Sequence, residues 1–431
     1  MAYLSRIAQK LLQASESRAP IVYPNPWSTY DEARFIDVAA DAATYEEDAR
    51  FGTFVDIGRE GLRDGVLIGG YRRDVDVGGV VLNAGLGHHY DETGNVLVFD
   101  TATDGGADRI INGYFGWDGA LDRQSLNCIF GAYGEDGRNV GTPAAAGVVH
   151  PRYNAGGAWV NGAPTGYTPS TAIANDGWGA GVCISGDGTR VGMSCIEGSR
   201  IAVATISPLA VMAEEQIITP SGSPADVGQT RNLKMNLDGD IFVVGDHVAQ
   251  KVWTFTRVGT TWSEVDVMTV AGGTYATEVV VSDDGTRLFV GDRTGAPSGG
   301  GQLYHYTRDG TGWSLVEIVV PSGSSSTDNF AGRGAVGIAP SGTTVAIGAA
   351  GDDTIATNQG KVYIFRIEGG LLVEKQAITA TTVYGPALFG SAVACDDEMI
   401  VVGGSGDDHN NPGVTDNAGA VWSFVATSPF V

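Results

Sequence analysis

A short phrase recurs along the chain, and it limits the folds that the chain can adopt. Residues 282–291 read SDDGTRLFVG, and related phrases are SGDGTRVGMS at 185–194, NLDGDIFVVG at 236–245 and PSGTTVAIGA at 340–349. In each phrase an Asp-Gly or Ser-Gly pair suits the positive-φ turn of a tight hairpin, and the apolar residues after it suit a buried strand. Hairpins at a near-regular spacing predict a repeat protein.

The repeat is counted from the small residue that ends the second strand of each hairpin. Seven such residues follow one another along the chain: Gly69, Gly131, Ser194, Gly245, Gly291, Gly348 and Gly403. A third strand is expected after each of them, starting near residues 94, 156, 199, 250, 301, 360 and 419. With a fourth strand after the third, this pattern predicts an all-β fold, a seven-bladed β-propeller of four-stranded blades.

The two ends of the chain are expected to close the ring. The last repeat has no fourth strand, and residues 31–40 are predicted to supply it by pairing with the strand at 419–425, which hides both open edges. Residues 26–431 then form the propeller, and residues 1–25 form a short N-terminal anchor helix and a linker outside the ring. The helix is predicted from apolar residues spaced along one helical face. It is too short to be stable alone, so we expect it to dock on a partner.

Charge and cysteine usage exclude some partners. Asp and Glu number 50 against 26 Lys and Arg, a formal net charge of −24. Nucleic-acid partners are not expected, because phosphate contacts need a basic surface. No stretch approaches the roughly 20 apolar residues of a membrane span, so no membrane insertion is expected. The four cysteines show no CxxC pair and no metal-ligand spacing, so we expect free buried thiols and folding in a reducing compartment: Cys128, Cys183, Cys195 and Cys395.

The opening residues of the repeats resemble a known family. Phe-Gly pairs stand at Phe51-Gly52, Phe115-Gly116 and Phe389-Gly390, and GKVYIF at 360–365 begins a third strand. This pattern is similar to the FG-GAP repeats of integrin α-subunit propellers, over residues 27–431. The resemblance implies a propeller of the adhesive type. The calcium loop of that family is not intact here, because SGDGTR and SDDGTR are short hairpins, so no cofactor is expected and calcium is left as an open alternative.

Catalytic motifs are absent from the sequence. It contains no G-x-S-x-G elbow, no P-loop and no H-E-x-x-H. Acidic pairs such as Asp283-Asp284 stand at turns, where turn chemistry explains them. The adjacent histidines His88 and His89 are expected to be solvated, so no metal site is predicted. Enzymatic activity is therefore unsupported, although the fold alone does not decide the function.

The longest connections are the candidates for a binding surface. Residues 70–93, 132–156 and 404–418 are predicted to join second to third strands in blades 1, 2 and 7, which become neighbours when the ring closes. Long loops on a rigid scaffold often carry function, and aromatic residues mixed with Arg and carboxylates suit a sugar or protein surface. The alternative is that these loops have no role. The candidate ligand-binding residues are Tyr71, Arg72, Arg73, His88, His89, Tyr90, Tyr133, Glu135, Arg138, Asp407 and His409.

An adhesive propeller with free thiols, a docking helix and no signal peptide suits a virion component that folds in a host cytoplasm. We therefore expect a virion structural protein, a bacteriophage tail, fibre or head-decoration protein, joined to other virion proteins through residues 1–25. It would display the propeller for attachment to a host-surface glycan or protein, or serve the architecture of the particle. The alternatives are a polysaccharide-degrading propeller enzyme (a depolymerase) and a bacterial surface adhesin.

Overall fold

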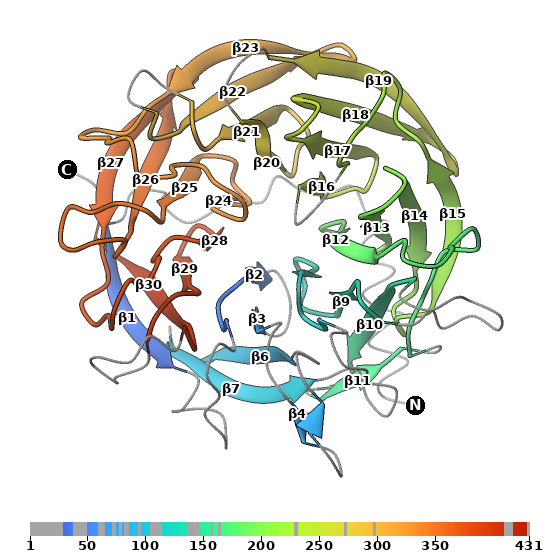
Figure 1. Cartoon of the computed structure of the whole chain (residues 1–431), viewed down its shortest axis with the longest axis horizontal. Helices are drawn as coiled ribbons and strands as arrows, with labels where there is room; N and C mark the ends of the chain where they lie inside the picture. Colours follow the sequence, from blue (N-terminus) through green and yellow to red (C-terminus); the bar gives the residue numbers. More distant parts are fainter. Residues whose placement is uncertain are drawn as a thin grey trace.

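The computed structural model describes residues 29–37, 50–58, 65–70, 75–76, 80–81, 86–93, 96–103, 114–135, 146–156, 158–162, 165–227, 232–270, 274–295, 299–408 and 417–428. These residues form seven four-stranded sheets, which stand as blades around one axis (Figure 1). No helix occurs among them. The structure confirms the predicted all-β, seven-bladed propeller of four-stranded blades.

The blades follow one another along the chain, and in blades 1 to 6 the chain passes from the innermost strand to the outermost. Blade 1 consists of β2 (Val55–Gly58), β3 (Gly65–Gly70), β6 (Leu86–Thr93) and β7 (Val96–Thr103). Blade 2 consists of β8 (Gly119–Leu121), β9 (Asn127–Ala132), β10 (Val148–Asn154) and β11 (Trp159–Asn161). Blade 3 consists of β12 (Trp178–Ile184), β13 (Arg190–Cys195), β14 (Ile201–Ile206) and β15 (Met212–Ile218).

The second half of the ring continues the same order. Blade 4 consists of β16 (Leu233–Met235), β17 (Ile241–Asp246), β18 (Lys251–Val258) and β19 (Thr261–Thr269). Blade 5 consists of β20 (Tyr275–Val281), β21 (Arg287–Asp292), β22 (Gln302–Asp309) and β23 (Gly312–Val319). Blade 6 consists of β24 (Val336–Ile338), β25 (Thr344–Ala349), β26 (Lys361–Glu368) and β27 (Leu371–Ile378). Blade 7 consists of β28 (Ala392–Cys395), β29 (Met399–Gly404), β30 (Ala420–Ser428) and, outermost, β1 (Thr29–Asp37).

Connections alternate between the two faces of the ring, because neighbouring strands of a blade are antiparallel. The connections from first to second and from third to fourth strands lie on one face, which we call the turn face. The connections from second to third strands, and from one blade to the next, lie on the opposite face, which we call the loop face. A small ribbon of β4 (Val75–Asp76) and β5 (Val80–Val81) belongs to the connection between β3 and β6.

The hydrophobic core lies within the blades and in the seams between them. The strands β17, β25 and β29 are buried at every residue, because their β-branched and small residues sit between two neighbouring strands and two neighbouring blades. The outermost strands β19 and β27 instead mix buried and exposed residues. Packing between blades therefore holds the ring together.

Glycines bring neighbouring blades into backbone contact. A Cβ on Gly348 in β25 would lie 2.0 Å from the carbonyl oxygen of Gly390 in blade 7. A Cβ on Gly403 in β29 would lie 2.1 Å from the carbonyl oxygen of Gly52 in blade 1. These distances are far below van der Waals contact, so only glycine fits. The glycine that ends the second strand of one blade thus contacts, across the seam, the glycine of the Phe-Gly pair that opens the next blade.

The residue before that second glycine also binds the preceding blade. The N–H of Phe389 donates to the carbonyl of Gln359 at 2.9 Å, and the phenyl ring is fully buried. Blade 3 has no Phe-Gly pair, and Trp178 takes the position instead: its N–H donates to the carbonyl of Ala146 at 2.9 Å, and it precedes Gly179. The seam between blades 2 and 3 therefore has the same backbone contact, with an indole in place of the phenyl group.

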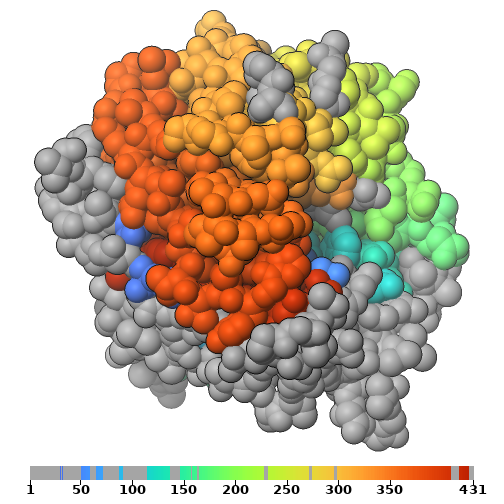
Figure 2. Space-filling model, turned by 60° about the vertical axis from the view of Figure 1, so that its left-hand side comes forward, coloured from blue at the N-terminus to red at the C-terminus, as the bar shows by residue number. Residues whose placement is uncertain are grey.

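A carboxylate on an outer strand ties each of four blades to the blade before it. It accepts hydrogen bonds from the backbone N–H and the hydroxyl of a Ser or Thr that follows the outer strand of the preceding blade; for Glu374 and Ser322 these measure 2.9 and 2.6 Å. Figure 2 shows one of these seams from outside, where the blue of β1 lies against the orange of blade 6. The pairs are Glu214 with Ser170, Glu264 with Ser221, Glu374 with Ser322, and Glu32 with Thr381.

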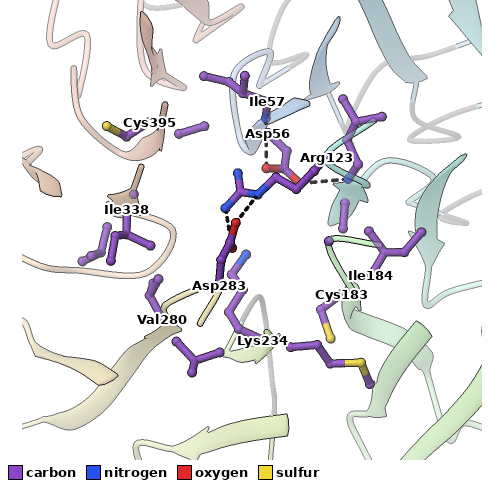
Figure 3. A pocket seen from close by; sticks show the side chains of 18 of the residues that line it. Asp56, Ile57, Arg123, Cys183, Ile184, Lys234, Val280, Asp283, Ile338 and Cys395 are labelled. Atoms are coloured by element: carbon purple, nitrogen blue, oxygen red, sulfur yellow. Dashed lines mark hydrogen bonds and ion pairs between the residues drawn. The ribbon is translucent and has the colours of Figure 1, made fainter. Parts of the chain in front are cut away.

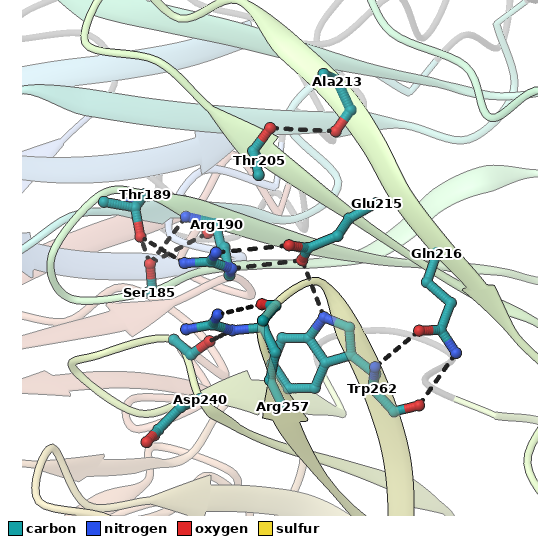
Figure 4. Close-up of polar contacts among 12 residues, drawn as sticks. Ser185, Thr189, Arg190, Thr205, Ala213, Glu215, Gln216, Asp240, Arg257 and Trp262 are labelled. Atoms are coloured by element: carbon teal, nitrogen blue, oxygen red, sulfur yellow. Dashed lines mark hydrogen bonds and ion pairs between the residues drawn. The ribbon is translucent and has the colours of Figure 1, made fainter.

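Two residues next to the first of these carboxylates complete the seam between blades 3 and 4 (Figure 4). Glu215 in β15 accepts the indole N–H of Trp262 at 3.0 Å and forms an ion pair with Arg190 at 3.4 Å. The amide of Gln216 holds both backbone groups of Trp262: the N–H of Trp262 donates to Oε1 at 2.8 Å, and Nε2 donates to the carbonyl of Trp262 at 3.1 Å. The outer strands are thus fixed in register relative to one another.

The N-terminal strand β1 is the outermost strand of blade 7. It is antiparallel to β30, with Tyr30 opposite Ala426 and Asp37 opposite Ala420. Gln376 of blade 6 holds both backbone groups of Tyr30 at 2.9 Å, as Gln216 holds Trp262 in blade 4. Like every fourth strand of the ring, β1 runs from the turn face to the loop face. The helix predicted within residues 1–25 lies outside the described residues.

The predicted third strands of blades 1 and 2 are wrong. The strands expected to start near residues 94 and 156 are the fourth strands β7 and β11, and the third strands are β6 and β10. These two read LGHHYDET and VVHPRYN, polar sequences of which one contains a proline, so the pattern favoured loops. Their polar side chains occupy the interior because they find partners there.

Candidate functional site

Three of the predicted binding residues do not lie in a loop. His88, His89 and Tyr90 belong to β6, and each is at most 2% exposed. The ring of His89 stacks on Trp159 with ring centroids 4.1 Å apart, and its Nε2 lies 3.6 Å from the thiol of Cys128. Burial holds the pKa of His89 well below its usual value, so the imidazole is neutral. These side chains pack inside blades 1 and 2 and are not part of the surface.

Two other candidates are carboxylates that the fold uses internally. Glu135 is 1% exposed, and its Oε2 lies 3.0 Å from Nε2 of the buried His150. Nδ1 of His150 lies 3.1 Å from the carbonyl oxygen of Thr165, so the imidazole is held between two oxygen atoms. Asp407 is also buried, and it accepts the N–H of Tyr384 at 2.9 Å. Both carboxylates fix connections on the loop face.

Tyr133 is the described candidate that stays partly exposed. It stacks on Tyr114 with ring centroids 5.0 Å and planes 12° apart, and Trp117 meets it edge-on at 5.1 Å. All three rings are half-buried. They lie on the loop face, where the chain enters β8 and leaves β9. We call Tyr114, Trp117 and Tyr133 the aromatic cluster.

Tyr114 and Trp117 were not predicted as site residues, although the sequence contains a signal for them. They flank the Phe-Gly pair of blade 2, and the equivalent residues of other blades are chemically unrelated. The equivalents of Tyr114 are Arg50, Asn329 and Leu388, and those of Trp117 are Thr53, Gly332 and Ser391. Tyr114 has φ of 53°, and its equivalents have φ of 57°, 54° and 55°. The fold thus dictates the backbone at this position but not the side chain, and alignment of the repeats would have revealed both aromatics.

The remaining candidates, Tyr71, Arg72, Arg73, Arg138 and His409, lie outside the described residues. Their connections are bounded by described strands: residues 71–85, 133–147 and 405–419 join second to third strands in blades 1, 2 and 7, fifteen residues in each case. The other four blades use four to eleven residues, at 196–200, 247–250, 293–301 and 350–360. The longest connections therefore stand on neighbouring blades, as expected. The predicted connections 70–93 and 132–156 were too long because they included β6 and β10.

The axis of the ring holds a cavity of about 110 Å³, lined by the inner strands of all seven blades (Figure 3). Each inner strand contributes one residue at the same height along the axis. In every blade this residue lies two positions before the last residue that pairs with the second strand at their turn. We call these seven residues the channel level. They are Asp56, Ala120, Cys183, Lys234, Val280, Gly337 and Ala394.

Only two residues of the channel level are charged, and both face the cavity. The carboxylate of Asp56 accepts the N–H of Ile57 at 2.9 Å and the N–H of Leu121 at 2.8 Å, one on each oxygen. The ammonium of Lys234 makes no hydrogen bond or ion pair with any residue of the described chain. Burial lowers the pKa of Lys234, but carboxylates led by Asp56 and Glu278 outweigh burial and raise that pKa, so the side chain is cationic.

An ion pair crosses the axis one level nearer the turn face. Arg123 of blade 2 and Asp283 of blade 5 form a bidentate contact, with Nε to Oδ2 at 3.0 Å and Nη2 to Oδ1 at 2.8 Å (Figure 3). Backbone hydrogen bonds join the turns around them: the N–H of Arg123 donates to Gly186 at 3.0 Å, and the N–H of Leu237 donates to Asp283 at 3.1 Å. These two charges satisfy each other and narrow this end of the cavity.

The cysteines are buried and unbridged, as predicted, and Cys183 faces Gly192 across its hairpin. Burial raises the pKa of all four thiols, that of Cys183 to about 12 and that of Cys195 to about 11, so none is an activated nucleophile. Within the described part of the chain, no three His, Cys, Asp or Glu side chains gather as a metal site. Nor does that part contain a helix long and apolar enough to cross a membrane.

Comparison with known proteins supports the fold. The family model of the FG-GAP repeat matches residues 313–365, from the outer strand of blade 5 to the third strand of blade 6. No curated protein matches the sequence. The β-propeller domain of Cps50 (Swd1) from Myceliophteria thermophila superposes with a TM-score of 0.55 at 10% identity, over 93% of this chain and all of that one. A putative 6-phosphogluconolactonase from Bacteroides fragilis gives 0.52 at 13% identity, over 76% of this chain and 84% of that one.

Likeness at these identities shows the fold alone. The seams described above and the matched repeat together define the chain as a seven-bladed β-propeller that contains an FG-GAP repeat.

Proposed function

We propose that this propeller is a recognition module that binds a surface glycan or protein through the loop face of blades 7, 1 and 2. The observation that carries the proposal is the aromatic cluster of Tyr114, Trp117 and Tyr133. Its rings are half-buried and packed against one another, so they offer a rigid apolar surface at small entropic cost on binding. Tyr and Trp are the residues that most often dominate binding surfaces.

The fold does not require aromatics at these positions. Other blades keep the same backbone with Arg, Asn or Leu in place of Tyr114, and with Thr, Gly or Ser in place of Trp117. The cluster also stands at the base of the 133–147 connection, one of the three longest, and Tyr133 is its first residue. Long connections on a rigid scaffold are common sites of recognition.

The setting that we propose is a virion, in which the ring is a structural tail, fibre or decoration protein assembled in a host cytoplasm. Two observations support it. The described cysteines are all unbridged, which suits a reducing compartment. In addition, β1 begins at the turn face, so Thr29, the first described residue, lies on the side of the ring opposite the aromatic cluster. An attachment through residues 1–25 to other virion proteins would then direct the loop face outward.

The binding proposal is tested by removing the aromatic cluster. The triple variant Tyr114→Ala, Trp117→Ala, Tyr133→Ala should bind whole host cells and an array of bacterial surface glycans at least about tenfold more weakly, since one anchor residue typically contributes about 2 kcal/mol. The matched control is Trp313→Ala, which removes a half-buried aromatic from the outer wall of blade 5 and should bind normally. Equal binding by the triple variant and the wild type would refute the proposal.

The virion setting has a separate test. Deletion of residues 1–20 should leave the melting temperature of the ring unchanged, because β1 is retained, while the protein no longer enters the particle. Normal incorporation of the shortened chain would refute the anchoring role without affecting the binding proposal.

A further inference from the structure

The channel level combines opposite charges with small residues. Asp56 stands in blade 1 and Lys234 in blade 4, so two inner strands separate them on one side of the ring and three on the other. The other five residues are alanine, cysteine, valine, glycine and alanine, which leave the cavity open. A volume of about 110 Å³ exceeds by several-fold the roughly 10–15 Å³ that one water needs.

We infer that this cavity is a binding site for a small zwitterion, a molecule with one ammonium and one carboxylate group such as a free α-amino acid. The ligand carboxylate would accept hydrogen bonds from Lys234, and the ligand ammonium would donate to Asp56. The site is distinct from the aromatic cluster and goes beyond the proposed recognition of a surface ligand.

Unused hydrogen-bonding capacity on both sides supports the assignment. Each oxygen of Asp56 accepts one backbone N–H, which leaves each with a further lone pair. Lys234 has three N–H donors and no hydrogen-bond or ion-pair partner among the described residues. The side chain of Lys234 is half-buried and lines the cavity, so a molecule in the cavity can reach its ammonium. The two groups are also too far apart to satisfy each other, because no ion pair within 4.0 Å joins them.

The charge around the cavity selects the class of ligand. Arg123 and Asp283 neutralise each other, so they leave no free charge for a ligand. The negative groups near Lys234 also include Glu278 and Asp118, so a ligand with net negative charge would be repelled. A ligand with net positive charge would be repelled by Lys234 itself. A molecule with separate opposite charges and no net charge matches Asp56 and Lys234 without either cost.

The size of the cavity restricts the ligand further. Ala120 and Ala394 line it at the channel level, and valine stands at the equivalent position of blade 5. Replacement of Ala394 by valine should therefore be tolerated by the inner strand while it reduces the free volume. The variant Ala394→Val keeps both charges and tests the cavity alone.

Isothermal titration calorimetry of the full-length protein with glycine and L-alanine tests the inference. The wild type should bind at least one of them, and it should bind none of three matched probes that lack one or both charges: acetate, methylamine and glycerol. Lys234→Met should weaken binding by at least about tenfold, since it removes a charge-assisted contact. The control Lys375→Met removes an ammonium that is paired with Glu368 on the outer wall and should bind as the wild type does.

Two outcomes overturn the inference. If the wild type binds neither glycine nor L-alanine, Lys234 serves only as a counter-ion for the carboxylates around it. If Lys234→Met or Ala394→Val binds as tightly as the wild type, the ligand occupies another place. Should Lys234→Met fail to fold, Ala394→Val still decides between these cases, because it retains both charges.

Discussion

The outer wall of the ring and the channel level are built from the outermost and innermost strands of the same blades, yet they differ in what recurs. On the outer wall, glutamate stands at one strand position in four blades and binds a Ser or Thr of the preceding blade each time. At the channel level, the equivalent positions hold small residues in five blades and opposite charges in the other two.

This difference separates the residues that the ring requires for its stability from the residues that occur in one blade only. A contact that every seam requires must be encoded once per blade, so it appears in the sequence as a repeat. A ligand site has no such requirement, and one blade can hold a residue that the others lack without loss of the seams. Lys234 at the channel level and Trp117 on the loop face are both residues of this second kind. Variants of the two regions should therefore differ in their effect on stability.

Removal of the N-terminal strand should have the largest effect. Deletion of residues 1–40 removes β1, which leaves the edge of β30 unpaired and takes Tyr30 out of a core that includes Trp422 and Phe424. We expect the shortened protein to aggregate or to lose its cooperative melting transition, measured by circular dichroism. The control is deletion of residues 1–20, which keeps β1. A 1–40 deletion that melts like the full chain would show that the outer wall does not need its last strand.

Substitution at a glycine seam should have the next largest effect. Gly348→Val places a side chain where its Cβ would lie 2.0 Å from the carbonyl of Gly390, so blades 6 and 7 must move apart. We expect a loss of about 3 kcal/mol or more in the free energy of unfolding, measured in denaturant. Gly312→Val is the matched control, because a Cβ there meets nothing closer than 3.4 Å. Equal losses in the two variants would mean that close approach between blades is not what selects glycine.

Asp122, in the turn next to the channel level, should make the free energy of unfolding of the ring depend on pH. Burial raises the pKa of Asp122 from 3.8 to about 7, although its carboxylate accepts three backbone N–H groups of its own turn. The folded state therefore binds this proton more tightly than the unfolded state. The contribution of Asp122 is fully present below pH 3.8 and is lost as the pH rises to about 7, at most about 4 kcal/mol in total.

The variant Asp122→Asn should flatten this part of the stability profile, because an asparagine does not titrate. Blade 4 already carries Asn236 at the equivalent place, where its side-chain oxygen accepts the N–H of Ile241 at 2.9 Å. Melting temperatures of both proteins between pH 4 and pH 8 provide the measurement. Parallel profiles would show that Asp122 does not contribute to the slope.

The sequence predicted most of the fold and little of the candidate sites, for one physical reason. The Asp-Gly turns and the seam glycines recur, so the number of blades could be counted before the structure was known. The polar strands β6 and β10 could not be assigned, because their stability depends on contacts far away in the sequence, such as that of His150 with Glu135. Nor could the sequence show that Lys234 and Asp56 line the same cavity, since only the closed ring brings blades 1 and 4 to one axis.

Loss of one outer-wall carboxylate should have the smallest effect. Blade 5 carries Leu315 where blades 3, 4, 6 and 7 carry glutamate, and in the sequence Gly272 stands where those four contacts use a Ser or Thr. The sequence thus lacks both partners of the contact at this position of blade 5, so we expect the ring to tolerate the loss of one copy. Glu374→Leu, which copies blade 5, should lower the free energy of unfolding by about 1 kcal/mol, the usual value of a partly exposed hydrogen bond.

A double-mutant cycle decides whether this loss comes from the contact itself. Ser322→Gly alone should cost a similar amount, because it removes the hydroxyl that donates to Glu374 at 2.6 Å and loosens the backbone of its turn. The double variant then carries the residues that the sequence has at the equivalent positions Leu315 and Gly272, and it should cost less than the sum of the single variants. Strict additivity would mean that Glu374 and Ser322 act independently, and that the recurrence of such pairs on the outer wall does not reflect a stabilising contact.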